Sequence, residues 1–233
     1  MNQSERRNYL IQKLLEEQPQ YAKMQIPGRC EEQKTLLRAL MNIRMPGELS
    51  EEFLQIQDAY LAEENAGRGI VTLAEIQELS TDLYLWKGDI TRLQVGAIVN
   101  AANSGMTGCY QPCHNCIDNC IHTYAGIELR NYCNDIMQRQ GYAEPTGQAK
   151  ITPAFNLPCD YVFYPQLGVK LCSMAGGGVQ KIYMVFLREP SRRDRSGSDL
   201  FHLRDGFEIK MNFDRNVSCF IFVNALMHDD FFD

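Results

Sequence analysis

The chain has 233 residues, of which 45% are hydrophobic, and its net charge at pH 7 is −6. This length and composition are sufficient for a buried core, and the acidic balance excludes a general nucleic-acid binder, which needs clustered lysine and arginine to displace counterions. The chain has no run of eighteen apolar residues, and its start, MNQSERRNYL, has no signal-peptide core, so we expect a cytoplasmic protein with no membrane partner. Its nine cysteines should then be reduced, which favours metal binding over disulfides.

Residues 1–80 are predicted to form a helical N-terminal extension. Two apolar stripes with helical spacing precede prolines, and Ser50 followed by two glutamates is a good start for a third helix. Because apolar stripes are usually core, we expect these helices to pack against the main domain, with a partner-binding or substrate-shaping role as the alternative. The stripes are Leu10, Ile11, Leu14 and Leu15, and then Leu36, Leu37, Leu40 and Ile43.

The next predicted strand is Leu83 to Trp86, and Asp89 follows it in a turn. An acidic residue just after a strand can accept a hydrogen bond from an exocyclic amine, provided that a small residue such as Gly88 lets the ligand approach the backbone. Alternatively, Asp89 caps the segment that begins at Thr91. The residues by themselves favour the cap.

The richest stretch of the sequence runs from Ala97 to His122 and reads AIVNAANSGMTGCYQPCHNCIDNCIH. Its first residues predict a buried strand of four to six residues, and its glycines and proline indicate a loop. Apolar residues with helical spacing resume at Ile117 and continue through Ile136, so we predict one helix that ends at Gly141. A strand, a polar loop and a helix start form the place where α/β folds bind ligands.

Cys109, His114 and Cys116 bring three soft nitrogen and sulfur donors into eight residues of this loop. Three such donors can close around one tetrahedral zinc ion and leave its fourth position for water or substrate, as in catalytic sites. Cys113 and Cys116 form a competing pair with the two-residue spacing of zinc fingers and redox motifs. The remaining alternative is that these cysteines are reduced core residues.

Separate roles are predicted for three other polar residues of the stretch. Asn103 lies at the predicted mouth of the sheet, where a carboxamide offers a donor and an acceptor to a pair of sugar hydroxyls. Asn100 is expected to be a satisfied buried polar group, and His122 to be packed rather than ligating, since helix geometry takes it away from the loop. Two further strands are predicted at 148–152 and 161–164.

The segments WKGDITRLQVGAIVNAAN and CIDNCIHTYAG resemble the macrodomain, the ADP-ribose-binding α/β fold. The intervening GCYQPCHNC resembles the zinc-dependent branch that removes ADP-ribose from proteins. The resemblance extends from about Leu83 to about Val162, and it implies a three-layer α/β/α sheet. Residues 81–164 would be the N-terminal half of this macrodomain core.

The resemblance also implies a function for the site. Asp118, which would otherwise be an N-terminal helix charge, matches an aspartate in the catalytic loop of macrodomains. The protein would hydrolyse the bond between ADP-ribose and an ADP-ribosylated protein, and an operon-encoded sirtuin-type ADP-ribosyltransferase and a lipoylated carrier would be its partners. The resemblance implies Asp118 and Asn103 for catalysis, with Asn103 at the distal ribose. For substrate binding it implies Asp89 at the adenine amine and the Ile90 backbone at the first phosphate, together with Cys116, Ile117 and Asp118. The implied zinc ligands are Cys109, His114 and Cys116.

From Tyr164 onward the sequence departs from the family. The expected His-Thr-Val-Gly-Pro signature is replaced by Tyr164 to Gly168, and the glycines of Ser173 to Val179 come too early for the second phosphate loop. A shifted reading frame is the simplest explanation, because suitable codons for Pro165 to Gly168, read two bases later, encode Thr-Val-Gly. Residues 165–233 would then form a divergent segment that leaves the sheet incomplete, although Ile182 to Leu187 and Phe220 to Val223 are apolar enough for strands.

Three alternatives to the hydrolase therefore remain open. The protein would be a reader that binds ADP-ribose without cleaving it, an inactive truncated or frameshifted macrodomain without the second phosphate loop, or a zinc module that only holds its loop together.

Overall fold

A computed structural model of the chain describes residues 1–21, 23–80, 83–166, 183–187, 199–203, 207–211 and 220–222. These residues form helices together with parallel and antiparallel strand pairs, which confirms the predicted α/β class. Within these ranges no helix has both the length and the apolar character needed to span a membrane.

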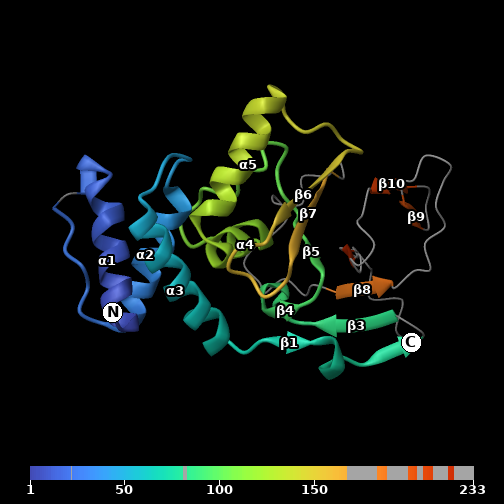
Figure 1. The fold of residues 1–233 in the computed structure, drawn as a ribbon, viewed down its shortest axis with the longest axis horizontal. Helices are drawn as coiled ribbons and strands as arrows, with labels where there is room; N and C mark the ends of the chain where they lie inside the picture. The colour runs from blue at the N-terminus through green and yellow to red at the C-terminus, as the bar shows by residue number, and fades with distance from the viewer. Residues whose placement is uncertain are drawn as a thin grey trace.

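The three predicted helices of the extension lie at one end of the molecule, drawn from blue to teal (Figure 1): α1 (Gln3–Glu16), α2 (Cys30–Ile43) and α3 (Glu51–Gly67). The predicted range 1–80 is not helical to its end, because residues 71–72 and 78–80 form strands. Ser50 caps α3, because its Oγ accepts a hydrogen bond from the Phe53 N–H at 3.1 Å. The apolar faces of the three helices meet in a second core, to which Ile127 at the start of the later helix 127–140 also contributes. Its buried members are Leu10, Ile11, Leu14, Leu15, Leu37, Leu40, Met41, Phe53, Tyr60, Leu61 and Ile127.

The central sheet has the strand order β5–β7–β6, where β5 is Ala97–Val99, β7 is Tyr161–Pro165 and β6 is Ala149–Pro153. β5 pairs with β7 in parallel, and β6 pairs with β7 antiparallel. The two later strands that we predicted are thereby confirmed, whereas β5 is shorter than expected. Helices α4 (Ile117–Ala125) and α5 (Ile127–Gln140) lie beside this sheet, between it and the helical extension (Figure 1).

A second sheet has the order β11–β8–β3–β2. β3 (Leu83–Lys87) confirms the predicted strand, and it pairs antiparallel with β2 (Glu78–Ser80) and with β8 (Tyr183–Leu187). β8 and β11 (Phe220–Phe222) confirm the strands expected in the C-terminal segment. Two short pairs complete the strands: β1 (Val71–Thr72) with β4 (Leu93–Gln94), and β9 (Asp199–Leu203) with β10 (Phe207–Met211).

Several predictions for the C-terminal part fall outside the described residues. Among them are the glycine-rich run from Ser173 to Val179 and most of the segment that we expected to leave the sheet incomplete.

The single helix predicted from Ile117 to Gly141 is wrong, because the chain breaks it at Gly126. Gly126 has φ +97°, a conformation outside the helical region that side chains disfavour. A Cβ atom at this position would lie 2.8 Å from Nε2 of Gln57 on α3. The Gln57 Oε1 accepts a hydrogen bond from the Ile127 N–H at 2.9 Å, so α3 fixes the point where α4 ends and α5 begins.

Candidate metal centre

Three predicted metal ligands converge in the loop between β5 and α4. The Cys109 Sγ, one ring nitrogen of His114 and the Cys116 Sγ all lie within 4.8 Å of one another. The distance from the Cys109 Sγ to the His114 Nδ1 is 3.7 Å. Cys116 is buried and is the N-cap of α4, whereas Cys109 and His114 are half-buried. The convergence inferred from their spacing is therefore confirmed.

This donor set fits zinc. Zinc lies about 2.3 Å from thiolate sulfur and about 2.0 Å from imidazole nitrogen, so ligands at tetrahedral angles are about 3.5 Å apart. The separations in the cluster are at most 4.8 Å, so small side-chain movements are enough to bring the three atoms onto one ion. Three protein ligands would leave one position of a tetrahedral site for water or substrate.

Cys113, the competing ligand, faces away from this cluster. Its Sγ donates to the backbone carbonyl of Thr35 on α2 at 3.4 Å, and its N–H donates to the Oδ1 of Asn42 at 3.0 Å. The cluster of donor atoms contains Cys116 without Cys113, so the geometry favours the Cys109–His114–Cys116 set over the Cys113–Cys116 pair.

Asp118 lies behind the cluster in the first turn of α4, and only 2% of it is exposed. Its Oδ1 accepts a hydrogen bond from the Asn100 Nδ2 at 2.8 Å, at the end of β5. Burial raises the pKa of Asp118 to about 6, although the Asn100 hydrogen bond and the nearby Arg130 charge oppose the shift. Asn100 is fully buried, as predicted, but the prediction that it is fully satisfied is wrong, because its Oδ1 has no hydrogen-bond partner among the described residues.

His122 is packed inside the fold, which confirms the prediction that it is not a ligand of the cluster. Its Nε2 lies 3.6 Å from the Asp118 Oδ1. Burial lowers the pKa of His122 to about 3, so the ring is neutral and the contact is not an ion pair. Neither ring nitrogen has a hydrogen-bond partner among the described residues.

Asn103 is exposed on the same loop. Its Oδ1 accepts from the Gly105 N–H at 2.9 Å, and its Nδ2 is 3.4 Å from the Gly108 carbonyl. The side chain therefore shapes the turn that leads to Cys109 while it lies at the protein surface.

Asp89 forms the helix cap that the sequence allowed as an alternative. Its Oδ1 accepts from the Thr91 N–H at 3.0 Å. A residue that the sequence did not indicate, Arg68 at the end of α3, forms an ion pair with Asp89 and donates to the Thr91 Oγ1 at 2.7 Å. The Arg68 guanidinium also lies over the Tyr124 ring, 3.3 Å from its centroid. The side chain of Ile90 is buried, as is that of Ile117 at the start of α4.

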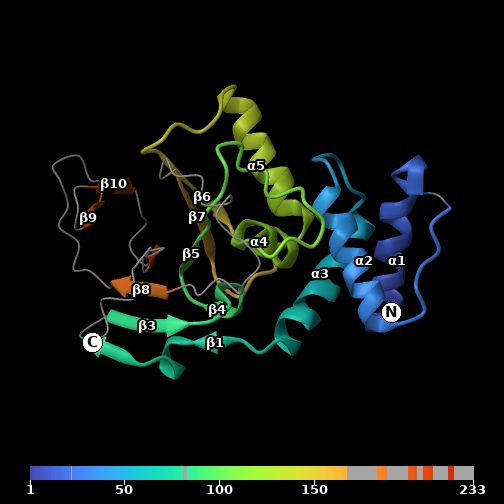
Figure 2. The same ribbon diagram turned by 180° about the vertical axis from the view of Figure 1, so that it is seen from behind.

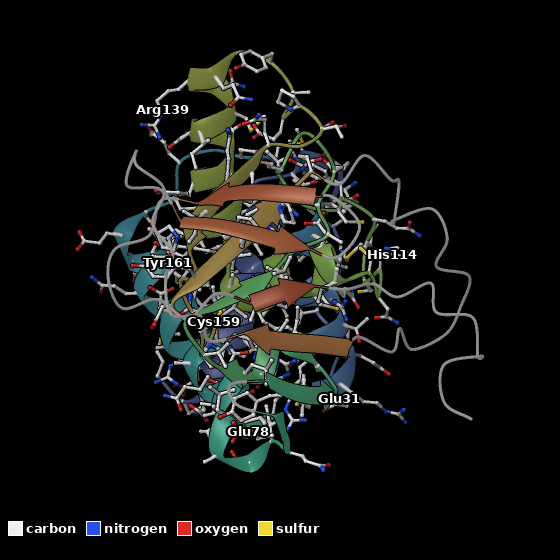
Figure 3. All side chains as sticks on the ribbon, turned by 90° about the vertical axis from the view of Figure 1, so that its right-hand side faces the viewer. Glu31, Glu78, His114, Arg139, Cys159 and Tyr161 are labelled. Carbon is white, nitrogen blue, oxygen red and sulfur yellow. The ribbon has the colours of Figure 1, made fainter. Side chains whose placement is uncertain are left out.

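The helical extension also reaches the loop that holds the three donors. We call residues 109–116 the metal loop. Arg38 and Asn42 of α2 form hydrogen bonds to this loop and to α4. Figure 3 shows His114 near the edge of the molecule, on the same side as Glu31 of α2 and opposite Tyr161. These contacts were not predicted, because polar residues beside an apolar stripe carry no signal of a distant partner.

Arg130 of α5 joins the end of α2 to the start of the same loop. Its Nη1 donates to the carbonyl oxygens of Met41, Asn42 and Arg44 at 3.1, 2.7 and 2.7 Å. Its Nε donates to the Thr107 carbonyl at 2.8 Å. A buried guanidinium with several carbonyl acceptors is well satisfied, so Arg130 fixes α2 against the segment that precedes Cys109.

Comparisons with known proteins agree with this architecture. Residues 99–167 match the family model described as Macro domain. A relative from Treponema medium named protein-ADP-ribose hydrolase is 60% identical over 168 residues, which are 70% of this chain and 64% of the relative. A Staphylococcus aureus (strain MRSA252) protein with the same name is 40% identical over 160 residues, which are 68% of this chain and 60% of that protein. The chain thus spans less than two thirds of the length of these relatives.

Solved structures give a weaker comparison. The Oceanobacillus iheyensis macrodomain with MES bound is 30% identical and has a TM-score of 0.31, with 36% of this chain and 49% of that chain covered. The Trypanosoma brucei macrodomain in complex with ADP-ribose is 23% identical and has a TM-score of 0.38, with 55% and 57% covered. Overlaps of this size support no conclusion about the site.

Proposed function

Because residues 99–167 belong to the macrodomain family, we propose that this protein removes ADP-ribose from modified protein side chains by hydrolysis. The identity of 60% and 40% to two relatives named protein-ADP-ribose hydrolase supports this assignment. The substrate would be an ADP-ribosylated protein, and the bond to be broken would join the acceptor side chain to C1″ of the distal ribose.

Zinc is the cofactor in this proposal, and the observation that carries it is the convergence of Cys109, His114 and Cys116 at the start of α4. A protein that only holds ADP-ribose has no need for two sulfurs and an imidazole beside the ligand, so the cluster favours a hydrolase over a reader. A zinc ion held by these residues would supply a Lewis acid that polarises an oxygen near the distal ribose.

The other residues of the site would bind and orient the substrate. Asn103 lies at the surface, where its carboxamide would meet the hydroxyls of the distal ribose. Asp89 would accept from the adenine amine, and the backbone of Ile90 would approach the first phosphate. Asp118 faces Asn100 rather than solvent. It would therefore act on the sugar only where the substrate reaches the end of β5.

The decisive experiment measures release of labelled ADP-ribose from a mono-ADP-ribosylated acceptor protein. We expect that removal of metal with a chelator abolishes release, that added zinc restores it, and that Cys116→Ala cannot be restored. Cys30→Ala is a matched control, since Cys30 is an exposed cysteine outside the donor cluster, and this variant should keep full activity. Elemental analysis of the same samples should find zinc in the native chain and in the control.

The remaining candidate functions predict different results. A reader binds free ADP-ribose in a calorimeter but releases none from the modified protein. A zinc module binds metal without affinity for the nucleotide, and an inactive macrodomain shows neither release nor nucleotide binding. Full release by protein that contains no zinc would refute the metal-dependent reaction.

A further inference from the structure

We infer that helix α2 of the N-terminal extension is part of the metal centre, and that Arg38 and Asn42 are positioning residues that hold the metal loop in its ligand-binding shape. This inference rests on the proposed zinc site. α2 lies beside α4 in both ribbon views (Figure 1 and Figure 2). Neither residue contributes a donor atom to the cluster, so both would act through the ligands.

Arg38 joins the two sides of the cluster through one nitrogen. Its Nη2 donates to the His114 carbonyl at 2.8 Å and to the Asn119 Oδ1 at 3.0 Å, and it lies 3.7 Å from the Cys120 Sγ. His114 belongs to the metal loop, whereas Asn119 and Cys120 belong to α4. Arg38 has no ion pair with a carboxylate among the described residues, and its Nε is buried there without a hydrogen-bond partner. The polar contacts of this guanidinium are therefore directed at the metal centre.

Asn119 passes this constraint on to the other end of the loop. Its side chain is fully buried, and its Nδ2 donates to the carbonyls of Cys109 and Gln111 at 3.3 and 3.0 Å. Because the Asn119 Oδ1 accepts from Arg38, the NH₂ group of this amide points toward these carbonyls. A flipped amide would place the Asn119 Oδ1 against the carbonyl oxygens, with no donor between them. Arg38 thus fixes the backbone of one ligand, His114, directly and that of another, Cys109, through Asn119.

Asn42 holds the turn between these two ligands. Its Oδ1 accepts from the Cys113 N–H at 3.0 Å, and its Nδ2 donates to the Thr123 Oγ1 of α4 at 3.0 Å. Cys113 has φ +54°, a left-handed conformation that is unfavourable for a residue with a side chain. Contacts with α2, from Asn42 to the Cys113 N–H and from the Cys113 Sγ to the Thr35 carbonyl, hold this conformation.

The consequence is a metal loop that is ordered before the ion binds. Without α2, metal binding would have to supply the free energy that orders the eight residues from the first ligand to the last. Loss of outer-shell partners of this kind lowers metal affinity by roughly 10- to 100-fold. The helical extension therefore has a functional role that its apolar stripe does not reveal.

The test is titration of the metal-free full chain with Co²⁺, followed by the visible absorption of cobalt bound to thiolate, with Zn²⁺ competition to obtain both affinities. We expect Arg38→Ala to bind Co²⁺ about tenfold more weakly than the native chain. Arg29→Ala is the matched control, since the side chain of Arg29 at the start of α2 is 86% exposed and lies outside the contacts described above. The control should bind as the native chain does.

A second measurement separates positioning from general loss of structure. In the metal-free chain, hydrogen exchange of the Cys113 amide should be faster in Arg38→Ala than in Arg29→Ala, while urea unfolding shows that both remain folded. If Arg38→Ala does not fold, Arg38→Lys takes its place, because lysine keeps the charge but not the planar guanidinium whose Nη2 makes these contacts.

The outcomes distinguish this inference from the proposed function. Unchanged Co²⁺ affinity and unchanged amide exchange in the Arg38 variants would overturn the positioning role and leave the zinc site intact. A native chain that binds neither Co²⁺ nor Zn²⁺ would overturn the zinc site itself, and with it this inference.

Discussion

Gly108, the residue before the first metal ligand, gives the sharpest test of the packing around the loop. It has φ +86°, and a Cβ atom built on it would lie 2.9 Å from two ring carbons of His122 and 3.2 Å from the Arg130 Nη2. Neither neighbour can move easily, because His122 is buried and Arg130 is held by four carbonyl oxygens. Gly108→Ala should therefore both strain the backbone and overpack the interior.

The magnitude follows from a comparison with Gly141, where φ is similar but the space is open. Gly141 has φ +77°, and nothing lies within 4 Å of a Cβ atom built there. Alanine in a left-handed conformation costs about 1–2 kcal/mol at either position, and the lower entropy of the unfolded chain offsets about 0.4–1 kcal/mol of this at both. Only Gly108→Ala adds an overpacking cost of about 1–3 kcal/mol. The difference between the two variants should therefore be about 1–3 kcal/mol.

Urea unfolding of the two variants measures this difference, with the native chain as reference. Gly108→Ala should have the lower midpoint at an unchanged slope, and its Co²⁺ affinity should fall because Cys109 is displaced. Equal free energies of unfolding for the two variants would show that His122 and Arg130 do not enclose Gly108 as described.

Two further predictions concern the contacts of α3. Burial, together with the charge of Asp58, raises the pKa of Glu128 from its ordinary 4.5 to about 7. The folded state then binds more protons than the unfolded state, so stability should fall as pH rises from 4.5 to 7, by about 1 kcal/mol after allowance for solvent screening of this half-buried group. In urea unfolding at pH 5 and pH 7, Glu128→Gln should show much less of this decrease in the free energy of unfolding. An unchanged pH dependence in the variant would contradict the prediction. Arg68→Ala should free Asp89 from its ion pair and weaken the binding of AMP about fivefold, as expected for loss of a charge-assisted hydrogen bond at a half-exposed site. Ribose 5-phosphate, which has no adenine, should bind as before. An equal loss for both ligands in calorimetry would refute a role for Arg68 at the adenine.

The local chemistry of the site could be predicted because it is local in the sequence. Cys109, His114 and Cys116 lie within eight residues, so their spacing alone indicated that they could meet. The helices of the extension were predictable for the same reason, since each apolar stripe repeats within one helix. The sequence did not decide whether Cys113 was a ligand, and the contact that turns it away comes from Asn42, more than seventy residues earlier.

The errors and omissions have the same physical origin. The break at Gly126 depends on Gln57 of α3, which occupies the space where a side chain would continue the helix. A glycine within an apolar period costs only about 1 kcal/mol in a helix, so it does not by itself predict an end. The ion pair of Arg68 with Asp89 likewise joins two residues that no periodic pattern in the sequence connects.

These long-range contacts make the helical extension and the rest of the described fold one structural unit across the sequence boundary near residue 80. Buried amides of α3 satisfy backbone groups of the core: the Asn65 Nδ2 donates to the carbonyls of Tyr124 and Asn156 at 3.1 and 2.7 Å, and Gln57 binds the Ile127 N–H. An interface of apolar stripes alone could shift at little cost, whereas a shift here would leave each buried backbone group unpaired at about 1–3 kcal/mol. The two regions should therefore unfold together, and the geometry of the metal loop should depend on helices that contain none of its ligands.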